Sequence, residues 1–296
     1  MNADACQPYQ RPEANYAGPM MARLHVSIVV IGDEILGGFV RDTNSGWIAG
    51  RLHTLGIPLD RIVTVPDDAG AIDEALQAEL ARHRPRVVLT SGGLGSTPDD
   101  LTVESVAASL GLTLRVNPEI DAWITRALEW TAAQGAEISP DHERAMRKMA
   151  RVPESARLLP CVGGLAPGIA VDVDGGCHTE SGATIVIMPG VPSELKRIMR
   201  QGVEPSLLHG RGSPLHVAEI RHGYPESTLS PLLDRLAVEY GDLHVGSYPD
   251  RECVIRLKGP AERVEQAMSV IRAFLSELDA SPSSHRLRAV WVARWQ

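Results

Sequence analysis

The chain has 296 residues, 44% hydrophobic and 22% charged, and its 37 Asp and Glu outnumber 29 Lys and Arg, giving a formal net charge of -8. This acidic balance argues against a general nucleic-acid or anionic-membrane binder, because such binding needs clustered Lys and Arg. Four scattered cysteines without a C-x-x-C pair favour reduced, cytoplasmic thiols, and no apolar run approaches the roughly 18 residues of a membrane span.

The chain begins with a segment rich in Pro, Asn, Gln and Tyr that lacks the apolar core of a signal peptide, and residues 1–21 are expected to be a disordered tail. Strands and helices then alternate. Apolar runs predict strands over residues 24–31, 57–65 and 86–91. Amphipathic stretches predict helices over residues 43–56 and 67–83, and a third from about Thr102.

Local signals mark the ends of these helices. Thr43 or Asn44 is the expected N-cap of the first helix and Gly56 its C-terminal stop, whereas Asp67 or Asp68 is expected to cap the second. Short connections between alternating strands and helices are typical of an α/β fold with a doubly wound, mostly parallel sheet, which we expect over residues 22–212.

The middle of the chain, residues 117–151, has a helical pattern in which Trp123, Ala127 and Trp130 recur at helical spacing. A basic cluster follows, which we interpret as a solvated helix face, with a phosphate-facing role as the alternative: Arg144, Arg147, Lys148 and Arg151. Residues 163–173 and 182–190 then predict a pair of strands. Pro192 sits at the start of the next helix, where its missing N–H costs nothing.

The pattern changes near residue 213. Residues 213–280 predict a small α+β domain with the order β-α-β-β-α, and its last helix has an apolar face: Val264, Met268, Ile271, Leu275 and Leu278. Between Leu215 and Ala280 there are 7 Lys and Arg against 11 Asp and Glu. RNA binding by this domain is therefore not expected. Residues 281–296 continue no pattern and are expected to be a tail.

The segment "VVLTSGGLGSTPDDLTVES" joins a predicted strand to a predicted helix through a glycine-rich loop. Gly92, Gly93 and Gly95 let the backbone approach a ligand closely, and the unpaired amides at a helix start favour an anion such as a phosphate or pyrophosphate. The hydroxyl groups nearby are further donors: Ser91, Ser96 and Thr97.

Acidic residues follow the same strand ends, where ligands of such sheets bind. Asp99 and Asp100 end the glycine loop, Asp67 and Asp68 follow the second strand, and "GDE", with Asp33 and Glu34, follows the first. Two carboxylates that bring Mg²⁺ to substrate phosphates would explain acids beside an anion site. Helix capping is the alternative, although it explains one aspartate per helix and not a pair at each.

Four segments in this order resemble the MoaB/Mog (molybdopterin-binding) domain, in the form found at the front of the competence/damage-inducible protein A (CinA) family: "IGDEILGGFVRDTNSGWIAGRLHTLGI", "VPDD", "SGGLGSTPDDLT" and "MPGVPSELK". The resemblance covers residues 24–280. In Mog-type molybdopterin adenylyltransferases, functional aspartates lie at positions that match Asp67 and Asp100. Leu94 and the Asp-Asp pair are the CinA-type form of the loop.

The resemblance implies hydrolysis of a dinucleotide-like pyrophosphate such as ADP-ribose, with Asp67 and Asp100 as catalytic residues. A flavin dinucleotide is a second candidate, because eukaryotic FAD synthases contain a similar domain. The expected cofactor is a divalent metal (Mg²⁺, Mn²⁺ or Co²⁺) held by Asp67, Asp99 and Asp100, with K⁺ as a further candidate. The predicted substrate-binding residues are Gly32, Asp33, Glu34, Asn44, Ser91, Gly92, Gly93, Gly95, Ser96, Thr97, Pro189 and Gly190.

Two rival hypotheses remain open: adenylyl transfer to molybdopterin, and a non-catalytic protein that binds molybdopterin or a nucleotide. Departures from the family pattern motivate the second, since Ser96 replaces a common Pro, Leu165 replaces a Thr, and Met149 lies where an amide is common. The carboxy-terminal unit resembles the family's KH-type linker domain. The expected partners are a nucleotide or pterin small molecule and a further copy of the chain, as a dimer or trimer. The resemblance does not extend to the deamidase domain of longer CinA proteins.

Overall fold

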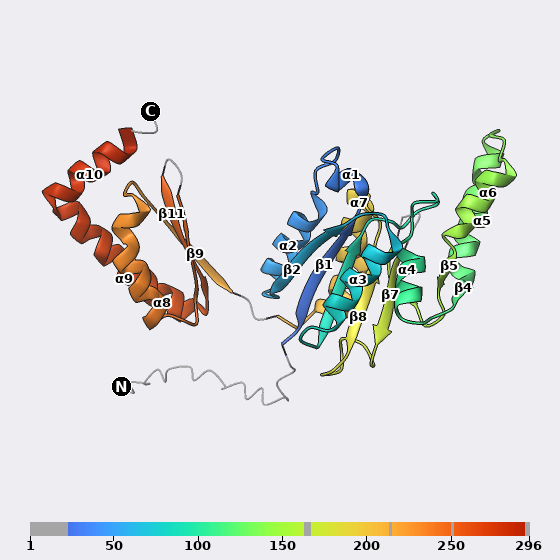
Figure 1. Ribbon diagram of the computed structural model, residues 1–296, viewed down its shortest axis with the longest axis horizontal. Helices are drawn as coiled ribbons and strands as arrows, with labels where there is room; N and C mark the ends of the chain where they lie inside the picture. Colours follow the sequence, from blue (N-terminus) through green and yellow to red (C-terminus); the bar gives the residue numbers. More distant parts are fainter. Residues whose placement is uncertain (1–22, 163–166, 213–214, 250–251, 294–296) are drawn as a thin grey trace, which may run out of the picture.

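The computed structural model describes residues 23–162, 167–212, 215–249 and 252–293. Its amino-terminal unit (residues 23–212) is built on a six-stranded sheet with the strand order β2-β1-β3-β8-β7-β6 (Figure 1). The strands are β1 (His25–Ile31), β2 (Leu59–Val65), β3 (Arg86–Ser91), β6 (Arg157–Leu159), β7 (Gly168–Val173) and β8 (Ala183–Ile187). Strands β2, β1, β3 and β8 run parallel, and β7 and β6 are antiparallel to their neighbours. The predicted mostly parallel sheet is confirmed.

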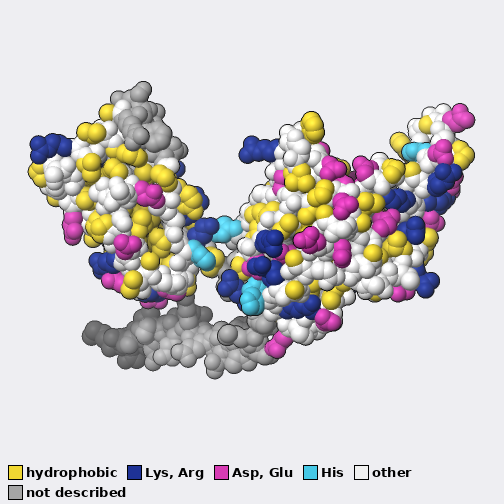
Figure 2. Space-filling model, in the orientation of Figure 1, with side chains coloured by type: hydrophobic (Ala, Val, Ile, Leu, Met, Phe, Trp, Pro, Cys, Tyr) yellow, Lys and Arg dark blue, Asp and Glu magenta, His cyan; other side chains and the backbone are white. Residues whose placement is uncertain are grey.

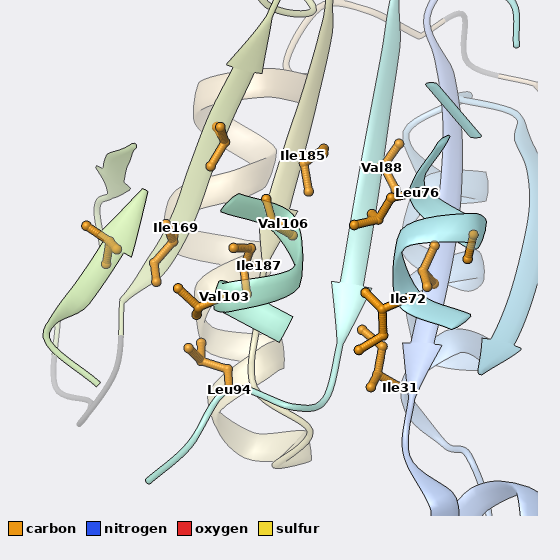
Figure 3. Packing of buried hydrophobic residues seen from close by; sticks show 14 of the residues in the cluster. Ile31, Ile72, Leu76, Val88, Leu94, Val103, Val106, Ile169, Ile185 and Ile187 are labelled. Carbon is orange, nitrogen blue, oxygen red and sulfur yellow. The ribbon is translucent and has the colours of Figure 1, made fainter. Parts of the chain in front are cut away.

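Helices cover both faces of this sheet, which is why its central strands are buried along almost their whole length. On one face, Ile72 and Leu76 of α3 and Val103 and Val106 of α4 point toward the sheet (Figure 3). They belong to the same buried cluster as Val88, Ile185 and Ile187 of its strands. The helices of this unit are α1 (Asp33–Leu36), α2 (Asn44–Thr54), α3 (Ala69–Leu80), α4 (Thr102–Ser109), α5 (Pro118–Ala133), α6 (Pro140–Lys148) and α7 (Pro192–Ile198).

The other face of the sheet packs on α2, α7 and a π-helical segment (Met199–Leu208) that continues α7. Ile48 and Leu52 of α2 and Ile198 of α7 belong to the same buried cluster as Ile28 and Leu89 of the sheet. Alternate residues of each central strand therefore enter two different cores. This arrangement leaves the carboxyl ends of the parallel strands open for a ligand site.

Helices α5 and α6 form an excursion from this core, closed at its base by a short antiparallel pair, β4 (Leu114–Val116) and β5 (Arg151–Pro153). The helical pattern predicted for this region is confirmed, and the buried face of α5 is formed by aliphatic residues. Helix α5 buries Ile120, Ile124 and Leu128, whereas Trp130 is 67% exposed. The aliphatic residues recur every four positions and face the core, and Trp130 falls outside that stripe.

The carboxy-terminal unit (residues 215–293) appears in Figure 1 as a separate body beside the first. Its antiparallel sheet has the order β10-β11-β9. Its elements are β9 (His216–His222), a 3-10 turn (Glu226–Leu229), α8 (Ser230–Glu239), β10 (His244–Tyr248), β11 (Cys253–Gly259), α9 (Ala261–Ala280) and α10 (Pro282–Ala293). The predicted order β-α-β-β-α is confirmed, and the predicted apolar face of α9 packs against the sheet.

The two predicted tails have different outcomes. The expected amino-terminal tail, residues 1–21, lies outside the described residues. The segment expected as a carboxy-terminal tail instead contains helix α10. Ser281 has an extended backbone that ends α9, and Pro282 then starts a new helix at a position where proline is favoured. Helix α10 therefore extends the small domain beyond its predicted end.

Lys, Arg, Asp and Glu side chains are intermingled on the face of the amino-terminal unit shown in Figure 2. The described residues of this face form no basic stripe of the kind that binds nucleic acid. Within the described part of the chain, no helix is both long and apolar enough to cross a membrane.

Candidate functional site

The first two predicted motifs meet at the carboxyl ends of β1 and β2. Gly32 follows β1 and its N–H donates to the Val65 carbonyl oxygen at 3.1 Å. The next amide, that of Asp33, donates to Asp67 Oδ2 at 2.9 Å. Because β1 and β2 are parallel neighbours, "GDE" and "PDD" lie side by side, and the carboxylate of Asp67 is held in place by a backbone donor.

The glycine loop follows β3, next to β1, and needs glycine at two positions. Gly92 has φ +109°, and a Cβ added there would overlap the carbonyl oxygen of Ile31. Gly93 has φ +61°, and a Cβ added there would overlap Oγ1 of Thr102. This hydroxyl donates a hydrogen bond to the Gly92 carbonyl oxygen at 2.9 Å. The loop thus crosses directly over the end of β1 and enters α4, which begins at Thr102 as predicted.

Asp100 is a structural member of the glycine loop. Its Oδ2 accepts hydrogen bonds from the Thr97 amide at 2.8 Å and from Thr97 Oγ1 at 2.6 Å. A Cβ at Gly95 would overlap the same carboxylate, so a larger residue there would displace Asp100 from its present position. One oxygen of this predicted catalytic residue therefore shapes the loop in the structure described here.

Lys148, at the end of α6, binds the backbone of the same loop. Its Nζ donates to the carbonyl oxygens of Thr97 and Asp100 at 2.8 and 2.7 Å. The other members of the predicted basic cluster behave differently: Arg144 pairs with Asp141, and Arg147 pairs with acids on α5 and α6. The interpretation as a solvated face holds for these two arginines, and for Lys148 it is wrong.

Asn44 links three elements at the floor of the site. Its Nδ2 donates to Ser91 Oγ at 3.0 Å and to the Gly190 carbonyl oxygen at 2.8 Å, joining α2 to β3 and to the turn after β8. The side chain is buried, and its Oδ1 has no hydrogen-bond partner among the described residues. Buried amide oxygens are rarely left unpaired, so this atom is an available acceptor beside the glycine loop.

The start of α2 is capped by a residue that the sequence reading did not identify. Asp42 Oδ1 accepts from the amides of Asn44 and Ser45 at 2.9 and 3.0 Å, whereas Thr43 makes no side-chain capping bond. Thr43 is the N-cap residue, as predicted, but the side chain that accepts the capping hydrogen bonds is that of Asp42. Asp42 frees the Asn44 side chain for the site, and the sequence "DTN" was the available signal.

The adjacent aspartates Asp67 and Asp68 make different contacts. Asp68 caps α3 by accepting from the Ala71 amide at 2.9 Å, as the capping alternative predicted for one member of the pair. Asp67 is left with the Asp33 amide. Burial raises the pKa of Asp67, the Asp33 amide opposes this, and repulsion from Glu34, Asp33 and Asp99 adds to the increase.

These four carboxylates, hereafter the acidic group, are Asp33, Glu34, Asp67 and Asp99. The exposed Asp99 differs from Asp67, because hydrogen bonding within the loop, with help from the charge of Lys148, lowers the pKa of Asp99. The structure thus brings three strand ends together as predicted. It also places Gly190 beside Gly92, since a Cβ on Gly190 would lie 3.5 Å from Gly92 Cα.

The fit of a metal ion to this group is partial. Among the described residues, no three His, Cys, Asp or Glu side chains converge as a ready-made metal cage, so Asp67, Asp99 and Asp100 are not gathered into one coordination group. Mg²⁺ that bridges to substrate phosphates needs only one or two carboxylates, however, and the hard oxygen donors of the acidic group suit it. Asp67 and Asp99 are the pair that fits, because Asp100 is engaged with Thr97.

Comparison with known proteins identifies the family. Residues 27–209 match the family model described as "Probable molybdopterin binding domain". The chain belongs to this family. Its CinA-type form is supported by a CinA-like protein of Prochlorococcus marinus, which is 35% identical over 91% of this chain and 59% of its own length. The expected membership of the CinA family and its MoaB/Mog-type domain is confirmed.

Two further relatives extend this picture of the CinA-like chain. A protein of Pyrobaculum arsenaticum is 36% identical over 75% of this chain and 78% of its own length. The crystal structure of a CinA protein of unknown function from Thermoplasma acidophilum is 32% identical, covers 60% of this chain and 94% of its own, and superposes with a TM-score of 0.48. The chain spans less than two thirds of the Prochlorococcus relative, so what that longer protein does as a whole is not transferred to this one.

Proposed function

We propose that this CinA-like protein hydrolyses the pyrophosphate bond of a dinucleotide-like substrate such as ADP-ribose, with the help of a divalent cation. The observation that carries the proposal is that the glycine loop crosses the end of β1, the same strand end at which the Asp33 amide holds the Asp67 carboxylate. Amides at a helix start suit a pyrophosphate, whereas clustered carboxylates repel one unless a cation lies between them.

The chain's own residues supply binding and orientation. The amides of Gly92 and Thr97 are paired within the protein, so the substrate phosphates would bind the other amides of the glycine loop. Asn44 Oδ1 and Ser91 Oγ offer polar atoms for the adjoining part of the substrate. Asp100 and Lys148 fix the loop from its two sides. When bound, a divalent cation would neutralise phosphate charge and polarise a phosphoryl oxygen.

The proposed step is balanced with water as the only co-reactant. A water oxygen attacks one phosphorus of ADP-ribose, the bridging P–O bond breaks, and AMP and ribose 5-phosphate leave. The water loses its proton to a carboxylate of the acidic group. We place this reaction in the cytoplasm, which agrees with Cys161, Cys177 and Cys253 being free thiols.

The test is release of AMP from ADP-ribose with Mg²⁺, Mn²⁺ or Co²⁺. Asp67→Asn and Asp100→Asn should each reduce turnover by about 100-fold or more, because they remove a carboxylate of the site and weaken the loop. Asp73→Asn is the matched control, since Asp73 is an exposed acid on α3 away from the strand ends. Absence of AMP with every metal would refute the proposal.

Adenylyl transfer to molybdopterin is the second candidate, and the family match to a molybdopterin-binding domain favours it. The same amide and carboxylate arrangement could hold the triphosphate of ATP in place of a pyrophosphate. Formation of adenylylated molybdopterin from ATP, without hydrolysis of ADP-ribose, would select this candidate. Tight nucleotide binding in calorimetry with neither product would instead indicate a non-catalytic binding protein.

A further inference from the structure

A cavity of about 810 Å³ lies in the carboxy-terminal unit, away from the glycine loop. It is formed by the end of β9, the residue before β11 and helix α10. The polar side of its lining comprises Arg221, His222, Glu252, His285 and Arg288. Its volume falls within the range of about 300–1,000 Å³ that is typical of small-molecule sites.

Helix α10 is seated against β9 in a way that fixes one of these side chains. A Cβ on Gly223 would lie 2.9 Å from Arg288 Nε, so glycine is what allows Arg288 to pack there. Arg288 also donates to Asp279 at 3.1 Å and lies over the Tyr224 ring at 5.6 Å. Tyr224 donates to the same Asp279 oxygen at 2.7 Å. The guanidinium is therefore positioned before any ligand arrives, which reduces the entropy that binding must overcome.

His222 adds a buried donor to the wall of the cavity. The side chain is only 6% exposed, and its Nδ1 accepts from the Tyr224 amide at 3.3 Å. The neutral ring must then carry its proton on Nε2. Burial and the nearby Arg288 lower the pKa of His222, which keeps the ring neutral. Nε2 has no partner among the described residues, and a buried donor without an acceptor is costly.

We propose that this cavity binds the phosphate group of a small molecule. The guanidinium groups of Arg221 and Arg288 match the oxygens of a phosphate, and the Nε2–H of His222 lacks an acceptor that a phosphate oxygen supplies after a small movement of the ring. Glu252 is the opposing carboxylate of the lining, and it is exposed at the rim. Asp279 is engaged by Tyr224 and Arg288.

The test uses the full chain and inorganic phosphate, followed through the imidazole nitrogen resonances of His222. Phosphate should shift the Nε2 signal, and acetate should not do so at the same concentration. Arg221→Met should weaken phosphate binding by about tenfold, since it removes one of two charged partners. Arg221 is exposed on β9 and takes no part in seating α10, so this variant is expected to fold normally.

Two comparisons decide the outcome. Arg286→Met removes the same charge from α10 at a residue outside the cavity, and it should bind phosphate like the parent protein. Arg288→Met should lose binding while retaining hydrolysis of ADP-ribose, which separates this cavity from the glycine-loop site. The proposal is overturned if phosphate leaves the His222 signal unchanged, if Arg286→Met weakens binding as much as Arg221→Met, or if only an oligonucleotide binds.

Discussion

The two ends of the parallel strands β1, β2 and β3 differ in how their charged side chains are paired. At the amino ends, Arg86 is fully buried and pairs with Asp60 at 2.9 Å and with the equally buried Glu79 at 3.4 Å. Ser27 donates to the same Glu79 carboxylate. The acidic group lies at the carboxyl ends. Among the described residues, none of its four carboxylates forms an ion pair with a lysine or arginine.

This difference separates structural charge from functional charge within one sheet. Buried ions are tolerated when each is paired and hydrogen-bonded, and every ion of the network around Arg86 is paired within the protein. Among the described residues, Glu79 Oε1 has an ion pair with Arg61 but no hydrogen bond. Repulsion within the acidic group is not compensated in the same way, as the raised pKa of Asp67 shows. A ligand is the natural source of the missing positive charge, and substitutions at the two ends should therefore have different consequences.

The largest effect is expected at the paired end. Arg86→Met removes the one fully buried cation of this network and leaves Glu79 with the partly exposed Arg61 and Arg82, and we expect it to lower the free energy of unfolding by about 3–5 kcal/mol. Urea denaturation of the purified variant measures this. Arg82→Met is the control, because Arg82 is 41% exposed and its distance to the same carboxylate is longer, 3.7 Å. A loss of less than about 1 kcal/mol for Arg86→Met would show that its charge is not part of a buried network.

The next effect is expected where the glycine loop crosses β1. Gly92→Ala places a Cβ onto the Ile31 carbonyl oxygen at a φ of +109°, and we expect a loss of about 1–3 kcal/mol in stability together with loss of turnover. Gly190→Ala is the matched control on the facing turn, since its Cβ would meet Gly92 Cα at an ordinary 3.5 Å. An equal loss of stability in both variants would contradict the role given to Gly92, and AMP release is compared with the parent protein only.

A smaller effect is expected for the lysine that holds the loop. Lys148→Met removes two hydrogen bonds to loop carbonyls, and we expect kcat/KM to fall by about tenfold with little change in global stability. Hydrogen exchange at residues 96–100 should also become faster, a readout that does not depend on turnover. Arg144→Met, in the same helix, should change neither quantity, because Arg144 contacts only the exposed Asp141.

The sequence predicted those features of the fold and the site that depend on residues close together in the chain. Apolar runs predicted the strands, and the glycines and aspartates predicted which strand ends meet, since parallel neighbours place such residues at one edge. It could not show that Lys148 reaches a loop about 50 positions earlier in the chain, or that Asn44 contacts Gly190 across 146 positions. Both contacts depend on how separate elements pack. Which of Asp67 and Asp68 caps α3 was likewise open, because either one fits the local pattern.

The smallest effect concerns the acidic end in the absence of metal. A carboxyl with a raised pKa is less stable when ionised in the folded protein than in the unfolded chain, so ionised Asp67 opposes folding above its folded pKa. In EDTA at pH 7, Asp67→Asn should therefore raise the free energy of unfolding, by less than about 1 kcal/mol because Asp67 is partly exposed. The gain should shrink as the pH falls toward the ordinary value of 3.8, where the unfolded carboxyl also binds a proton. Glu79→Gln, at the paired end, should be destabilising under the same conditions, because it weakens the pairing of the buried Arg86. If Asp67→Asn is destabilising at pH 7 as well, the carboxylates at both ends are structural and the contrast between the two ends of the sheet does not hold.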